Sequence, residues 1–100
     1  MVDPRTLVIG NTYFTVFYAD QGCRVPVVET YVYLGSEQRE HVFQTARSFH
    51  QRGNWNEMTE VERAAFDPAP VLTFDPESLE PVVDISGLVG EMSDTIARLK

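Results

Sequence analysis

The sequence contains a single cysteine, Cys23, among its 100 residues. One thiol cannot form a disulfide within the chain, and it cannot supply a cysteine-based zinc site. A lone cysteine fits a reducing compartment, which predicts a cytoplasmic protein. No stretch approaches the roughly 18 apolar residues of a membrane-spanning helix. The N-terminus also lacks a cationic segment followed by an apolar run, so we expect neither a signal peptide nor a membrane protein.

Positive charge is scarce in the second half of the chain. The net charge is −7. Residues 1–50 carry four cations and five acids, whereas residues 51–100 carry four cations and ten acids. Nucleic-acid binding depends on clustered lysine and arginine, so direct binding of nucleic acid is not expected. The acidic half instead favours a protein partner with a basic surface.

The common catalytic, phosphate-binding and metal-binding motifs are also missing. There is no G-x-x-x-x-G-K-[ST], no G-x-G-x-x-G, no H-E-x-x-H and no calcium loop. Cys23 lies beside the cation Arg24, but no histidine that could serve as its base is near in sequence. A metal site could draw on Glu37, His41 and His50, but the four-residue spacing of Glu37 and His41 is one that any helix produces by chance. We therefore expect no metal, no cofactor and no catalytic residue, and regard an enzyme as the less favoured class.

Carboxylates are numerous between residues 57 and 84, and paired carboxylates can perform acid–base chemistry. That chemistry requires a concave site in which the two pKa values are driven apart. Several of these acids have structural roles at helix starts, so a solvated acidic face is the favoured interpretation. The group comprises Glu57, Glu60, Glu62, Asp67, Asp75, Glu77, Glu80 and Asp84.

The composition, with 43% hydrophobic and 23% charged residues, is that of one globular domain over residues 1–100. Residues 12–19 and 25–34 are rich in β-branched and aromatic side chains. Such segments favour strands, and Asp20 to Gly22 between them supply turn chemistry. The pattern predicts an antiparallel hairpin near the N-terminus.

Both faces of the predicted hairpin are apolar, because side chains alternate along a strand. We expect the core to lie on the face formed by Phe14, Val16, Tyr18, Val28, Thr30, Val32 and Leu34. The opposite face must be covered by another part of the chain, which is the favoured interpretation, or by a partner. It carries Tyr13, Thr15, Phe17, Val25, Val27, Glu29, Tyr31 and Tyr33.

Residues 37–52 allow two structures. One is a single helix with Ser36 as its cap. The other is a short strand through Gln44, with Thr45 as the N-cap of a helix that ends at Arg52. We favour the second, because a third strand would complete a small sheet.

Later residues carry clearer local signals. Thr59 and Glu62 match a capping box and predict a short helix over about residues 60–66, ended by Asp67 before a proline. Residues 71–74 predict a strand, and Asp75 a cap for a single turn.

The strongest periodicity lies at the C-terminus, where apolar residues recur at spacings of three and four. It predicts an amphipathic helix that begins near Ser86, preceded by residues that fit an extended segment. Gly87 and Gly90 weaken the helix or let its backbone approach the sheet closely. We expect the apolar stripe to pack in the core; outside the monomer it would form a homodimer. The stripe is Val82, Ile85, Val89, Met92, Ile96 and Leu99.

These elements predict an α+β fold. A small antiparallel sheet, made of the N-terminal hairpin and one or two further strands, is accompanied by short helices and the amphipathic C-terminal helix. The order of aromatic strands followed by short helices is similar to that of small SH3-like barrels, so a closed barrel is one form the sheet can take.

The functional hypothesis that follows is a non-enzymatic protein-interaction or accessory domain. Its expected contact residues are the aromatic hairpin residues Tyr13, Phe17, Tyr31 and Tyr33, and the loop residue Trp55. The alternative is a small-molecule binder or minor enzyme, with a pocket between the sheet and the C-terminal helix and acids of residues 57–84 at its rim. A third hypothesis, an acidic mimic of nucleic acid, rests on charge alone.

Overall fold

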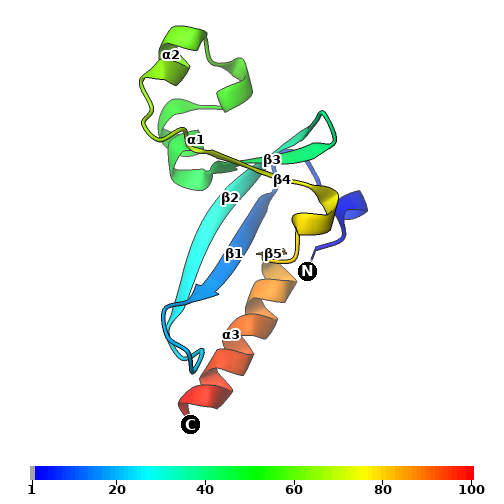
Figure 1. The fold of residues 1–100 in the computed structure, drawn as a ribbon, viewed down its shortest axis with the longest axis vertical. Helices are drawn as coiled ribbons and strands as arrows, with labels where there is room; N and C mark the ends of the chain where they lie inside the picture. The colour runs from blue at the N-terminus through cyan, green and yellow to red at the C-terminus, as the bar shows by residue number, and fades with distance from the viewer. Residues whose placement is uncertain (1) are drawn as a thin grey trace.

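A computed structural model describes residues 2–100 and shows one five-stranded antiparallel sheet with three α-helices (Figure 1). The strand order is β4-β3-β2-β1-β5. The predicted α+β class with a C-terminal helix is therefore confirmed. The sheet stays open, because β4 and β5 form its two edges, so an SH3-like barrel is not formed.

The predicted hairpin is formed by β1 (Thr12–Tyr18) and β2 (Pro26–Glu37). Its pairing runs from Thr12 opposite Val32 to Tyr18 opposite Pro26. The Asp20 carboxylate accepts hydrogen bonds from the backbone N–H groups of Val25 and Arg24, at 2.8 and 2.9 Å. The Val25 N–H contributes most to holding the pKa of Asp20 below its ordinary value. These two hydrogen bonds to the ionised Asp20 carboxylate hold the loop between β1 and β2 in place.

Residues 37–52 form a strand and then a helix, as favoured. The strand is β3 (Glu40–Thr45), and α1 (Ala46–Arg52) follows it directly. Thr45 occupies the N-cap position, but its hydroxyl donates to Ser48 Oγ rather than capping the helix. Gly53, at φ 86°, ends α1.

The next elements also follow the local signals. The capping box of Thr59 and Glu62 opens α2 (Glu60–Ala64), which ends slightly earlier than predicted. Strand β4 (Val71–Phe74) pairs with β3. Three short 3-10 helices complete this part of the description: η1 (Pro4–Thr6), η2 (Trp55–Glu57) and η3 (Pro76–Ser78).

The C-terminal segment contains β5 (Val82–Val83) and α3 (Ile85–Leu99). The N-cap of α3 is Asp84 rather than Ser86, because the Asp84 carboxylate accepts a hydrogen bond of 2.8 Å from the Gly87 N–H. Strand β5 pairs with β1, which places the start of α3 at the edge of the hairpin.

The core lies on the tyrosine-bearing face of the hairpin. The sequence instead predicts the core on the opposite face, which carries Phe14, Val16 and Tyr18. Tyr13 contacts the rings of Tyr33 and Phe43 edge-on, and Phe74 contacts Phe43 in the same way. Residues from both ends of the chain cover this face. The buried cluster is Val2, Tyr13, Tyr31, Tyr33, Phe43, Leu79 and Val82.

The opposite face is covered less completely. Val32, Leu34 and Val42 are buried there, whereas Phe14 and Val16 are half-buried and Val28 is exposed. The expectation that this face forms the core is therefore wrong for its outer half. Most of the apolar residues that pack on the sheet from elsewhere in the chain, such as Val2, Leu7 and Leu79, lie on the tyrosine side.

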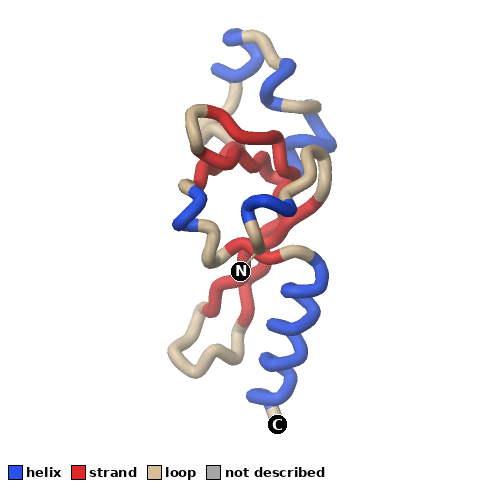
Figure 2. The backbone as a smooth tube through the Cα atoms, turned by 90° about the vertical axis from the view of Figure 1, so that its right-hand side faces the viewer, coloured by secondary structure: helices blue, strands red, loops and turns tan. Residues whose placement is uncertain are grey.

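The molecule is elongated. Its extents are 49 × 28 × 20 Å, and its radius of gyration is 14.9 Å, compared with about 13 Å for a compact chain of this length. Figure 2 shows α2 at one end of the long axis and α3 at the other. The outer half of the hairpin and α3 extend together beyond the core.

Two glycines of α3 provide a matched test of how closely this helix approaches the sheet. A Cβ on Gly87 would lie 2.8 Å from Val83 Cβ, whereas a Cβ on Gly90 would meet no atom within 4 Å. We expect Gly87→Ala to lower the free energy of unfolding by about 1 to 3 kcal/mol through overpacking. Gly90→Ala should raise it by up to about 1 kcal/mol through helix propensity. Urea denaturation measures both, and equal effects would contradict the close approach.

Candidate functional site

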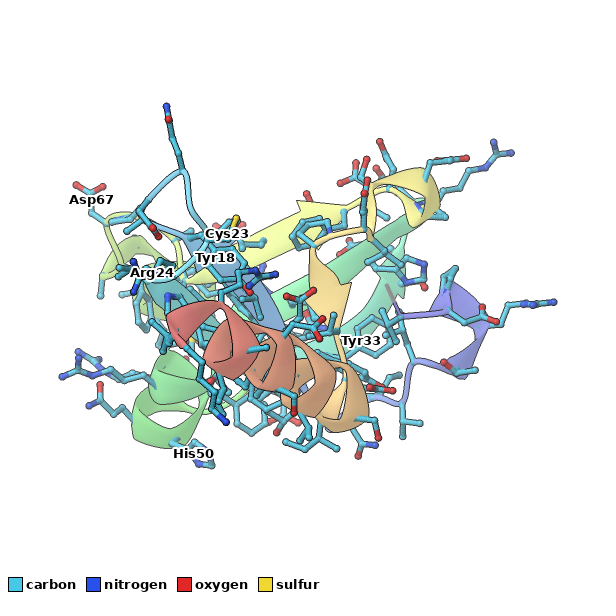
Figure 3. The ribbon with its side chains drawn as sticks, turned by 90° about the horizontal axis from the view of Figure 1, so that it is seen from below. Tyr18, Cys23, Arg24, Tyr33, His50 and Asp67 are labelled. Carbon is cyan, nitrogen blue, oxygen red and sulfur yellow. The ribbon has the colours of Figure 1, made fainter. Side chains whose placement is uncertain are left out.

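Polar contacts attach α3 to the hairpin. The Tyr18 hydroxyl donates to Glu91 Oε2 at 2.8 Å and lies 3.0 Å from Thr95 Oγ1. The Arg98 guanidinium lies 5.2 Å from the Tyr18 ring centre and donates to the Cys23 carbonyl at 3.1 Å. Figure 3 shows Tyr18 and Cys23 beside the helix. These polar contacts fix which side of the helix faces β1.

This attachment leaves the apolar side of α3 uncovered. We define the α3 stripe as Ile85, Val89, Met92, Ile96 and Leu99. Met92 is half-buried, and the other four side chains are 53 to 61% exposed. At 3.6 residues per turn, the stripe lies about a third of the way round the helix from Glu91 and Thr95. Of the predicted stripe, Val82 packs in the core as expected. For the α3 stripe the expectation is wrong, because the contact with β1 uses another side of the helix.

The outer half of the hairpin is also apolar and exposed. We define the hairpin end as Phe17, Val25, Val27 and Val28, which are 40 to 52% exposed. Val28 lies on the same face of the sheet as Tyr18 and therefore on the side of α3. Pairing of β2 with β3 begins at Tyr31. Within residues 2–100, no strand pairs with the β2 edge over residues 26–30, which leaves backbone groups available there.

The structure separates the residues predicted to contact a partner. Tyr13, Tyr31 and Tyr33 are only 4 to 7% exposed, so in this fold they belong to the core. Burial raises the pKa of the Tyr31 hydroxyl. Phe17 remains exposed at the hairpin end, and Trp55 is half-buried on the other side of the molecule.

Trp55 is anchored to the sheet and to α2. Its backbone N–H donates to Gln44 Oε1 at 2.9 Å. The Arg63 guanidinium donates twice to the Trp55 carbonyl, at 2.9 and 3.1 Å, and lies 5.0 Å from the indole ring centre. Phe66 contacts the indole edge at 5.9 Å between ring centres. These contacts give the Trp55 loop a defined position.

A cleft of about 510 Å³ lies between the Trp55 loop and strands β2, β3 and β4. It is on the face of the sheet opposite the tyrosine core, at the other end of the long axis from α3, where no pocket was predicted. Among the acids, only Glu37 lines it, so the acids of residues 57–84 do not form its rim. Its lining residues are Leu34, Gly35, Ser36, Glu37, Val42, Trp55, Asn56, Arg63, Val71 and Thr73.

One buried polar cluster resembles a catalytic arrangement in composition only. His41 Nδ1 lies 2.8 Å from the Tyr33 hydroxyl and 3.3 Å from Ser36 Oγ. Both hydroxyls converge on one ring nitrogen, and no described carboxylate bonds the other nitrogen to orient the ring. The cluster therefore ties the β2–β3 hairpin together. Across residues 2–100, no three His, Cys, Asp or Glu side chains gather closely enough to hold a metal ion.

Comparison of the chain with protein-family models, with curated proteins and with solved structures gives no match. Among the helices of the described part of the chain, none has the length and apolar character needed to cross a membrane. Function must therefore be inferred from the surfaces themselves.

The sequence identified every residue of the α3 stripe and predicted that it packs in the core, with a homodimer contact as the less favoured alternative. A partial signal was present in Gly87 and Thr95, which line another side of the same helix. A glycine and a polar residue on one side are suited to close polar contact with a strand.

The contacts of Arg63 predict that it positions Trp55. Arg63→Gln removes a charged donor to a carbonyl and a cation–π contact, so we expect the free energy of unfolding to fall by about 2 kcal/mol. The emission of Trp55, the single tryptophan, should shift to longer wavelength as water reaches the indole. Arg47→Gln, at a position on α1 away from the Trp55 contacts, is the control. Unchanged emission and stability in Arg63→Gln would show that the loop is held by other contacts.

Proposed function

We propose that the protein is a non-enzymatic protein-interaction domain that binds through the α3 stripe together with Val28, the residue of the hairpin end on the same side of the sheet. The observation that supports this function is the orientation of α3, which turns Glu91 and Thr95 toward Tyr18 of its own sheet and leaves its apolar stripe exposed. Monomeric proteins rarely expose large continuous apolar patches, and such patches commonly mark interaction sites.

Energetics favour burial of this surface by a partner. Removing apolar area from water contributes roughly 25 cal/mol per Å². The four exposed residues of the stripe lie on one helix, so they need little ordering before they bind, which lowers the entropic cost of association. The small polar residues Ser86 and Ser93 flank the stripe and would form part of a polar rim.

The charge distribution refines the expected partner. Residues 12–34 and 84–100 together carry three cations and five acids, whereas the rest of the chain carries five cations and ten acids. The proposed contact surface is thus less acidic than the remainder. It favours a partner with an apolar contact surface over a strongly basic one. The lone Cys23 still favours a reducing, cytoplasmic setting for this interaction.

A photo-crosslinking amino acid at Ser93, beside the stripe, tests the proposal in the native cell. We expect a defined crosslinked product that disappears when Val89→Lys is added, because the lysine places a charge in an apolar interface. Val61 of α2, whose side chain is 82% exposed, is the matched control site and should give no such product. Equal products from both sites, or persistence with Val89→Lys, would contradict the proposal.

The cleft supports a second candidate function, the binding of a small polar ligand. Its volume of about 510 Å³ lies in the range of ligand pockets. Arg63 offers a positive group, Glu37 a negative one, and Leu34 with Val42 an apolar floor. This combination is complementary to a small zwitterion with an apolar side chain.

Free amino acids are the probe for this second candidate. We expect at least one to shift the amide resonances of Ser36, Asn56 and Thr73 together and to change Trp55 fluorescence. Thr73→Tyr, which fills the cleft from an exposed position of β4, should abolish both responses. The matched control is Val61→Lys, which should leave them unchanged. If no amino acid shifts the cleft resonances, the zwitterion hypothesis is wrong.

A further inference from the structure

The partner of the α3 stripe can be inferred from the spacing and charge of the helix. Along the stripe, the intervals from Ile85 to Leu99 are four, three, four and three residues. This is the repeat of a coiled-coil seam, which is complementary to another helix with the same repeat. A second copy of this chain supplies that helix.

We infer that the protein forms a two-fold symmetric dimer in which the α3 helices of two copies pack antiparallel along their stripes. The inference rests on the proposed function and names the partner of the same surface. With the axis near Met92, the seam places Ile85 opposite the partner's Leu99 and Val89 opposite the partner's Ile96. Each contact occurs twice, as two-fold symmetry requires.

A hollow in the surface lies where this arrangement needs one. Ile85, Ser86 and Val89 line a shallow, open apolar depression at the first turn of α3. The antiparallel register brings the partner's Leu99 to this turn. A leucine entering such a hollow is the knob-into-hole contact of paired helices.

Charge favours the antiparallel direction over the parallel one. Asp84 lies at the N-terminal end of α3 and Lys100 at its C-terminal end. Antiparallel packing brings unlike charges and opposite helix-dipole ends together, whereas parallel packing would bring like charges together. The side chains next to the exposed seam are small, which allows close approach of two backbones. They are Ser86, Gly90, Ser93 and Ala97.

The helix pair alone is too small for a stable interface. A helix of 15 residues is about 22 Å long, and a specific interface buries about 800 Å² on each partner. The hairpin end supplies further apolar area, because Val28 lies on the same side of the sheet as α3. The dimer interface therefore has the α3 seam at its centre and Val28 at its flank, whereas Phe17 and Val27 lie on the other face of the hairpin and stay outside it.

Complementary variants test both the dimer and its direction. We expect the wild-type chain to sediment with twice the monomer mass. Val89→Lys and Ile96→Glu should each weaken association at least tenfold, because each places two charges in the apolar seam. An equimolar mixture of the two variants should regain the doubled mass. In the mixed dimer, the lysine at position 89 of one copy faces the glutamate at position 96 of the other. The symmetry-related contact keeps the original pair, Val89 against Ile96. Val61→Lys, on α2, should remain dimeric.

Each alternative result has a distinct meaning. Monomeric wild-type protein overturns the dimer, and a crosslink from Ser93 to a different protein would then leave the proposed function standing. Monomeric protein without a position-specific crosslink overturns both. If the single variants dissociate and their mixture does not recover, the antiparallel direction is wrong. Circular dichroism of each variant checks that α3 remains folded, as expected for substitutions at exposed positions.

Discussion

The hydroxyl of Tyr18 determines how the second half of the molecule is arranged. A partly buried hydroxyl needs hydrogen-bond partners, and here they come from Glu91 and Thr95, one turn apart on α3. Their common side of the helix must therefore face β1. The close approach of Gly87 to Val83 fixes the same rotation at the start of the helix. Once the rotation is fixed, the apolar stripe can only lie on an outer side.

The choice of core face depends on contacts between residues far apart in the sequence. Both faces of the hairpin carry apolar side chains, so alternation along the strands does not decide between them. The decision is made by Val2, at the start of the described chain, and by Leu79 and Val82, in the segment before α3, all of which pack on the tyrosine side. Because they are distant in sequence from the hairpin, no pattern within residues 12–34 could indicate which face they cover.

Elements specified by local chemistry were predicted well. The capping box at Thr59, the strand at residues 71–74 and the helix that follows Thr45 each depend on side chains within a few positions of one another. Features that depend on tertiary packing, such as the side on which a helix contacts the sheet, were not predicted. Periodicity identifies which residues of α3 share a stripe, but the direction of that stripe depends on Tyr18, more than 70 residues earlier in the chain. The cleft beside Trp55 was missed for the same reason, because β4 and α2 form it only after the sheet assembles.

The acidity of the chain is compatible with pairing of two copies through α3. Two molecules of net charge −7 repel one another, yet repulsion between exposed charges fades over a Debye length of about 8 Å at physiological ionic strength. The acids of α2 and its flanking loops lie at the opposite end of the 49 Å long axis from α3 (Figure 1). Their distance from the proposed interface far exceeds the Debye length. The electrostatic cost of association is then set mainly by the charges on α3 and at its ends, which are Asp84, Glu91, Asp94, Arg98 and Lys100.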